Sequence, residues 1–103
     1  MSRLISVAEV ASLPAGKSVA LSVEGQTLAL FNIGGAYYAI DDTCTHAGGN
    51  LSEGECEGTI VTCPWHGARF DLATGAVLSP PAREAVRCYP VHVQGQRIHV
   101  ELP

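Results

Sequence analysis

The chain has 103 residues, and its ten acidic and six basic residues give a formal net charge of −4. This length fits a single domain, and the acidic balance excludes a general nucleic-acid binder, which would carry a basic face. No stretch approaches the roughly 20 continuous apolar residues that cross a bilayer, and the first residues lack a basic region followed by an apolar signal core. We therefore expect one domain over residues 1–103 of a cytoplasmic, monomeric protein with no nucleic-acid or membrane partner.

The helical signal in this sequence is weak and lies near its start. Ser6 and Glu9 have the spacing of a capping box ahead of Val10. Pro14 and Gly16 follow closely, so we expect a helix of one or two turns at most.

Most of the chain shows strand and turn patterns. Alternating apolar residues between turn residues predict a meander of three strands, at residues 21–23, 27–33 and 36–40. A short strand at 59–62 and a C-terminal hairpin with strands at 91–93 and 98–102 are expected to follow. The fold class is therefore all-β, with an antiparallel β-sandwich or barrel-like base and a smaller lobe, about residues 41–71, inserted into it.

Strand periodicity also assigns side chains to faces. Phe31 is expected in the core. Tyr37 and Tyr38 must point to opposite faces of their strand, so at least one of them packs against neighbours. His92 and His99 alternate with apolar residues and are expected to face away from the core.

Two short runs each pair a cysteine with a histidine, Cys44-Thr45-His46 and Cys63-Pro64-Trp65-His66. A thiolate is a soft anionic ligand and a neutral imidazole is a borderline one, so the two types suit different irons of a 2Fe-2S cluster. The two cysteines would hold one iron and the two histidines the other. Replacing two thiolates by neutral ligands leaves the oxidised cluster uncharged, which makes it easier to reduce than an all-cysteine cluster.

The same four side chains would also complete a tetrahedral zinc site. Structural zinc sites usually pair Cys with Cys and His with His across short spacers, whereas each run here mixes the two types. The spacing therefore favours an iron–sulfur cluster and leaves a zinc-bound structural module as an alternative.

The likeness to a known family extends beyond these two runs, to residues 63–71, 74–75, 80–81 and 89–91. On these residues the chain resembles the Rieske ferredoxins of bacterial multicomponent aromatic-ring dioxygenases. The resemblance implies the Rieske fold and one Rieske-type [2Fe-2S] cluster per chain, covered by a loop at Pro80-Pro81. It further implies that the cluster ligands are Cys44, His46, Cys63 and His66.

The resemblance also implies a function. Ferredoxins of this family carry single electrons from a flavoprotein NAD(P)H reductase to a terminal Rieske non-haem iron oxygenase. The chain is then an electron-carrier component of aromatic hydrocarbon catabolism and not an enzyme. The alternative is a Rieske-like small subunit or regulatory module of a larger reductase, such as nitrite reductase. Many such modules lack the ligand set, which is complete here, so the carrier is favoured.

Departures from the respiratory type of Rieske protein are informative. That type has a disulfide between the two ligand loops, at the places where this chain has Gly48 and Trp65. It also has serine and tyrosine hydroxyls that bond to the cluster, where this chain has Ala68 and Phe70. Hydrogen bonds to sulfur favour the more negative reduced cluster, so we expect a midpoint potential at the low end of the Rieske range, roughly −150 mV.

Two cysteines remain outside the ligand runs. Cys56 and Cys88 are expected to be small, buried or half-buried apolar residues, and the sequence assigns them no function.

The segment between the ligand runs is acidic. Glu53, Glu55 and Glu57 alternate there, and Asp41-Asp42 precede the first run. These residues either form an acidic rim that steers docking onto basic patches of the partners or are simply solvated. For Trp65 the plainer expectation is a ring that shields the cluster from water.

Overall fold

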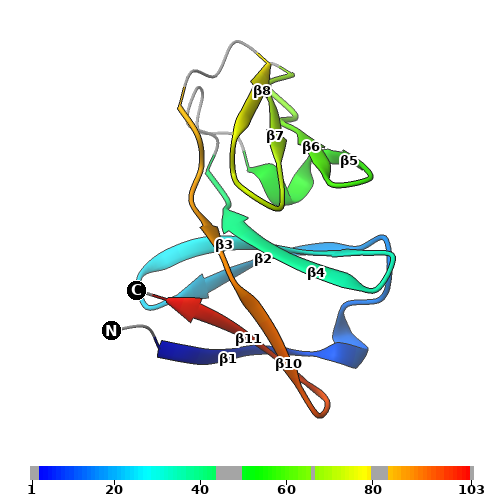
Figure 1. Cartoon of the computed structure of the whole chain (residues 1–103), viewed down its shortest axis with the longest axis vertical. Helices are drawn as coiled ribbons and strands as arrows, with labels where there is room; N and C mark the ends of the chain where they lie inside the picture. The colour runs from blue at the N-terminus through cyan, green and yellow to red at the C-terminus, as the bar shows by residue number, and fades with distance from the viewer. Residues whose placement is uncertain (1–2, 44–49, 66, 80–83, 103) are drawn as a thin grey trace.

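The computed structural model describes residues 3–43, 50–65, 67–79 and 84–102, which form three antiparallel sheets. The sheets lie one above another in Figure 1, with the sheet of β5 to β8 in a lobe at the top and both chain termini on the base, away from that lobe. The all-β prediction is confirmed. In the described residues, both helices are single 3-10 turns, so neither could cross a membrane.

The base consists of two sheets. The outer sheet has the order β1-β11-β10, with β1 at Arg3–Glu9, β10 at Val91–Gln94 and β11 at Arg97–Leu102. The middle sheet has the order β2-β3-β4-β9, with β2 at Ser18–Val23, β3 at Gln26–Ile33, β4 at Ala36–Asp41 and β9 at Cys88–Tyr89. The predicted meander and C-terminal hairpin are therefore confirmed.

The lobe contains the third sheet, in the order β5-β6-β7-β8. Its strands are β5 at Glu55–Glu57, β6 at Ile60–Thr62, β7 at Arg69–Asp71 and β8 at Val77–Ser79. The 3-10 helix η2, at Leu51–Glu53, precedes β5. The predicted short strand near residues 59–62 is confirmed as β6, which pairs with both β5 and β7.

The middle sheet is buried on both faces. Leu28 and Leu30 of β3 pack in one hydrophobic cluster with residues of the outer sheet, whereas Ala29 and Phe31 pack in a second cluster with residues of the lobe. This explains why β3 is a continuous apolar run and not an alternating one. The burial of Phe31 is confirmed.

The two tyrosines of β4 follow the same division. Tyr37 packs against the cluster of the base and Tyr38 against the cluster of the lobe. The prediction that they point to opposite faces is therefore confirmed.

The predicted N-terminal helix is wrong at its start. Ser6 lies in β1, which pairs with β11 along its length. The Ser6 hydroxyl accepts a hydrogen bond from the Nε of Arg97 at 2.7 Å and does not cap a helix. Only the 3-10 helix η1, at Val10–Ser12, remains of the expected element. Strand pairing with β11 outweighs the weak local capping signal.

A hydrogen-bonded tyrosine joins β4 to β9. The Tyr89 hydroxyl donates to Asp41 Oδ1 at 2.6 Å, and Gln26 Oε1 lies 3.1 Å from the same hydroxyl. The two strands also pair directly. Burial, and then the bond to the Asp41 carboxylate, raise the pKa of Tyr89 to about 12.

This shift predicts a pH dependence. The folded-state pKa of Tyr89 lies above its ordinary value of 10.0, so its contribution to stability is complete below pH 10 and is lost as the pH rises from 10 to about 12. We expect Tyr89→Phe to lower the free energy of unfolding by about 1 kcal/mol at pH 8, and the gap to the unchanged protein to shrink across that window. Urea unfolding of both proteins at each pH measures the gap.

Tyr37→Phe is the matched control, since Tyr37 is a half-buried tyrosine of the same sheet. A gap for Tyr89→Phe that stays constant up to pH 12 would contradict the assigned role of the Tyr89 hydroxyl.

Candidate metal centre

The second ligand run lies in a tight loop between β6 and β7. The Cys63 N–H donates to the Ala68 carbonyl at 2.7 Å, and the Gly67 N–H donates to the Cys63 carbonyl at 3.1 Å. Gly67 has a φ of +76°, a conformation that only glycine adopts without strain. The loop is therefore closed by its own backbone, and its glycine is required by its geometry.

The side chain of Cys63 fits a metal ligand. Cys63 is 2% exposed and belongs to the hydrophobic cluster of the lobe, with Leu51, Val61 and Phe70 among its members. A thiolate is costly in apolar surroundings unless a cation neutralises it. Cys63 is a buried thiol in the same run as a second predicted ligand, His66. It is therefore suited to binding iron.

The other predicted ligands, Cys44, His46 and His66, lie outside the described residues, as do Gly48 and Pro80-Pro81. Within residues 3–43, 50–65, 67–79 and 84–102, no group of three or more metal-binding side chains is found.

The residues that flank the first ligand run are described. Thr43 and Asn50 form an isolated antiparallel bridge, and they flank the segment 44–49 that contains Cys44 and His46. The residues on either side of segment 44–49 are therefore neighbours in space.

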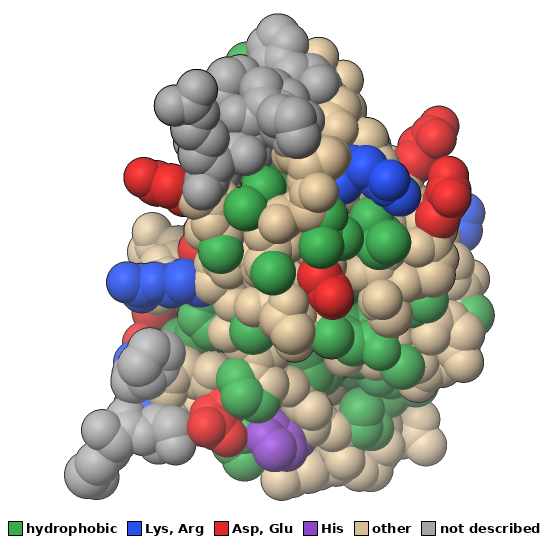
Figure 2. All heavy atoms as spheres, turned by 45° about the horizontal axis from the view of Figure 1, so that its top comes forward, with side chains coloured by type: hydrophobic (Ala, Val, Ile, Leu, Met, Phe, Trp, Pro, Cys, Tyr) green, Lys and Arg blue, Asp and Glu red, His purple; other side chains and the backbone are tan. Residues whose placement is uncertain are grey.

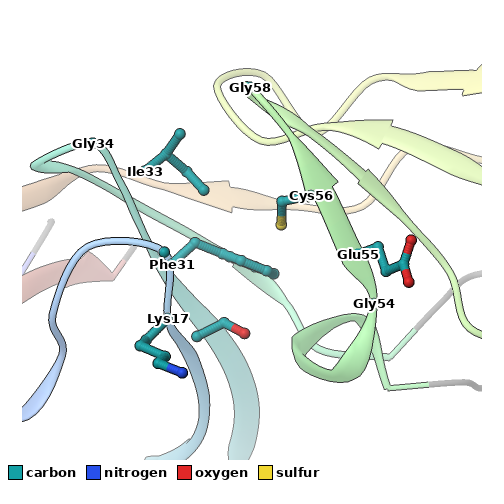
Figure 3. Close-up of a pocket in the computed structure, with 10 residues that line it drawn as sticks. Lys17, Phe31, Ile33, Gly34, Gly54, Glu55, Cys56 and Gly58 are labelled. Atoms are coloured by element: carbon teal, nitrogen blue, oxygen red, sulfur yellow. The ribbon is translucent and has the colours of Figure 1, made fainter.

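The two remaining cysteines differ from Cys63. Cys56 and Cys88 are both exposed, so the expectation that they are buried or half-buried is wrong. The sulfur of Cys56 nevertheless points into a cleft of about 460 Å³ between β3 and β5, toward Phe31, while Glu55 points out of it (Figure 3). Partial burial raises the pKa of the Cys56 thiol, which makes it a poor thiolate at neutral pH.

Carboxylates gather beside the Cys63 loop. Glu53, Glu55 and Glu57 line an open groove of about 410 Å³ together with Thr62, Cys63, Pro64 and Gly67. All three glutamates are exposed. On the face seen in Figure 2, acidic side chains are scattered, with some at both edges of the molecule and one near the middle. The three glutamates of the predicted acidic rim lie next to a predicted ligand.

Trp65 differs from its expected role. Its side chain is 62% exposed, the largest exposed fraction among the large hydrophobic residues of the described chain. A ring this exposed is directed mainly at solvent.

The histidines of the C-terminal hairpin lie far along the chain from the ligand runs. His92 is exposed, as expected, and its Nε2 lies 3.2 Å from Glu101 Oε1. His99 is half-buried, and its Nδ1 is buried without a hydrogen-bond partner.

The two aspartates that precede the first ligand run do not belong to an exposed acidic rim, so the sequence prediction that placed them with the three glutamates is wrong. Asp41 bonds to Tyr89, and Asp42 is 2% exposed and accepts a hydrogen bond from the Ser52 N–H. No local pattern separates them from solvated acidic residues, because their roles come from contacts with Tyr89 and Ser52.

Comparison with known proteins gives three findings. A family model for the Rieske [2Fe-2S] domain matches residues 3–90. The ferredoxin component of the naphthalene 1,2-dioxygenase system of Pseudomonas aeruginosa is 40% identical over 90 residues, which cover 87% of this chain and 86% of that protein. A chain in the solved complex of reduced oxygenase and oxidized ferredoxin of carbazole 1,9a-dioxygenase is 31% identical, with a TM-score of 0.87 over 94% of this chain and 91% of that chain.

A further solved structure is relevant to the alternative function. A putative NADH-dependent nitrite reductase small subunit from Mycobacterium tuberculosis is 25% identical, with a TM-score of 0.90 over 100% of this chain and 97% of that chain.

Proposed function

Because the chain belongs to the Rieske [2Fe-2S] domain family, we propose that it is a ferredoxin that carries single electrons from a flavoprotein NAD(P)H reductase to a terminal Rieske non-haem iron oxygenase. The observation that carries this proposal is the 40% identity to a dioxygenase ferredoxin over 86% of that protein's length. The similarity thus covers nearly the whole of a known carrier component. The chain binds a Rieske-type [2Fe-2S] cluster and is a carrier, while catalysis belongs to the oxygenase.

We assign the ligands as Cys44 and Cys63 on one iron and His46 and His66 on the other. The cluster, when bound, takes up and releases one electron at a time. The burial of Cys63 and its position in a backbone-closed loop support this assignment. The chain's own contribution is to hold the ligands, keep the thiolate side dry and present a docking surface.

The fold by itself does not distinguish this function from the alternative. The nitrite reductase small subunit matches this chain as well in its backbone as the dioxygenase ferredoxin does, but at lower identity. Direct electron transfer separates the two. We expect a flavoprotein reductase, added in catalytic amounts with NADH or NADPH, to reduce the protein. An aromatic-ring oxygenase should then re-oxidise it. Re-oxidation by a nitrite reductase large subunit, and by no oxygenase of a panel, would overturn the proposal.

The remaining properties follow from this function. We propose a cytoplasmic monomer in which residues 1–103 form one domain and the ligand loops belong to the inserted lobe. A reducing compartment supports free thiols, and Cys56 and Cys88 are not joined in disulfides.

The four cysteines provide a test of the ligand assignment. We expect Cys44→Ala and Cys63→Ala to lose the iron and the visible colour of the protein, because each removes a thiolate ligand. Cys56→Ala and Cys88→Ala should keep the full iron content, since both side chains are exposed. Iron and acid-labile sulfide assays measure the outcome. Iron loss in Cys56→Ala with retention in Cys63→Ala would refute the assignment.

Two residues that follow the second ligand run predict the midpoint potential of the cluster. Ala68 and Phe70 are fully buried, and Phe70 packs in the same cluster as Cys63. We expect protein-film voltammetry to give a midpoint potential of roughly −150 mV, and Ala68→Ser and Phe70→Tyr each to raise it, because a hydroxyl can donate to the cluster region. A midpoint above zero for the unchanged protein would rule out the low-potential carrier.

The acidic groove predicts salt-dependent docking. We expect the double variant Glu53→Gln, Glu55→Gln to associate more slowly with the oxygenase or reductase, and its association rate to depend less on salt, because two charges of the groove are removed. Stopped-flow electron transfer at several ionic strengths measures this. Glu9→Gln, Glu24→Gln is the control, since both residues belong to the base. Equal rates for the groove variant and the unchanged protein would mean that the groove is merely solvated.

A further inference from the structure

Asp42 is a buried carboxylate directly before the first ligand run. Its side chain is 2% exposed, and Asn32 is the other buried polar residue of the described chain. A carboxylate taken out of water is destabilising unless hydrogen bonds replace its hydration. The position of Asp42, two residues before Cys44, therefore requires an explanation.

Three hydrogen bonds hold this residue. Its N–H donates to the Thr27 carbonyl at 3.1 Å, and its carbonyl accepts from the Leu51 N–H at 2.6 Å. Its Oδ1 accepts from the Ser52 N–H at 2.8 Å. Asp42 thus ties the end of β4 to β3 on one side and to the 3-10 helix η2 on the other.

The second and third bonds close the segment 44–49 from outside. Leu51 and Ser52 follow this segment and Asp42 precedes it, so each bond links one end of the segment to the other. The bridge between Thr43 and Asn50 lies between these bonds and the segment. The Ser52 carbonyl in turn accepts from the Ser18 hydroxyl at 2.7 Å, which anchors η2 to β2.

Backbone bonds close both ligand loops, and a side-chain bond is added at the first. The Cys63 loop closes through backbone bonds between neighbouring strands, the Cys63 to Ala68 bond among them. The first run joins β4 to η2, which are not paired strands. There the Asp42 carboxylate supplies an acceptor for an N–H at the start of η2, and a charged acceptor makes a stronger bond than a neutral one.

We propose that Asp42 is a positioning residue for the cluster: its carboxylate and backbone hold the two ends of segment 44–49 together and so fix Cys44 and His46 relative to the Cys63 loop. This inference rests on the ligand assignment proposed above. Residues that hold metal ligands in position without touching the metal affect its binding, and removing them typically weakens metal binding 10- to 100-fold. Asp42 would act on the cluster in the same way.

The test uses the cluster-loaded protein and two variants of Asp42. We expect Asp42→Ala to lose iron to a ferrous chelator about tenfold faster or more, and to broaden the EPR spectrum of the reduced cluster. Asp42→Asn should stay within about threefold of the unchanged protein, because its amide oxygen still accepts from the Ser52 N–H. Iron release followed by absorbance and low-temperature EPR measure both effects.

Asn32→Ala is the control for a merely structural role. Asn32 is equally buried, and it binds the Leu13 carbonyl and the Gly35 N–H, each at 2.8 Å, on parts of the base remote in sequence from the ligand runs. We expect Asn32→Ala to unfold at lower urea concentration while its EPR spectrum and iron-release rate stay unchanged.

Two results would overturn the proposal. One is an Asp42→Ala protein with an unchanged EPR spectrum and iron-release rate. The other is an Asn32→Ala protein that releases iron as fast as Asp42→Ala. If Asp42→Ala does not fold, Asp42→Ser replaces it in the same measurements. The hydroxyl of the new serine is one bond too short to reach the Ser52 N–H, so the same loss is expected. Failure of the ligand assignment itself is separate, since the unchanged protein would then lack a Rieske-type EPR signal.

Discussion

The structure depends on a middle sheet that is buried on both faces. Leu28 and Leu30 of β3 pack toward the outer sheet, and Ala29 and Phe31 pack toward the lobe. One strand therefore contributes to both hydrophobic clusters, which makes the lobe part of the folded base and not an appendage. Removal of apolar surface from water on both faces is the main favourable term that holds the three sheets together.

This arrangement determines where the ligand loops begin. The first run follows β4, a central strand of the middle sheet, and the second follows β6, whose Val61 packs in the lobe cluster. Both loops thus start from strands whose burial leaves little freedom of movement. Backbone bonds close the second loop, and Asp42 ties the residues that flank the first.

Much of this molecule could be predicted from its sequence, for identifiable reasons. The meander over β2 to β4 follows from turn residues and apolar runs, and the ligand runs follow from residue types and spacing that few other sites use.

Local patterns failed where tertiary contacts determine the structure. Ser6 and Glu9 suggested a helix, yet pairing with β11 makes their segment a strand. The exposure of Trp65 and Cys56 in the lobe, and of Cys88 in β9 of the middle sheet, depends on which faces of the sheets other elements cover. The contacts of Asp42 with η2 join residues on either side of a ligand loop, and no periodicity reports them.

The most direct test of the account is the EPR spectrum of the dithionite-reduced protein. Two histidines on one iron lower the average g-value of a reduced 2Fe-2S cluster below that of an all-cysteine cluster. The account predicts this Rieske-type signal. An absent signal, together with zinc in the metal analysis, would contradict it and would make the chain a structural or regulatory module.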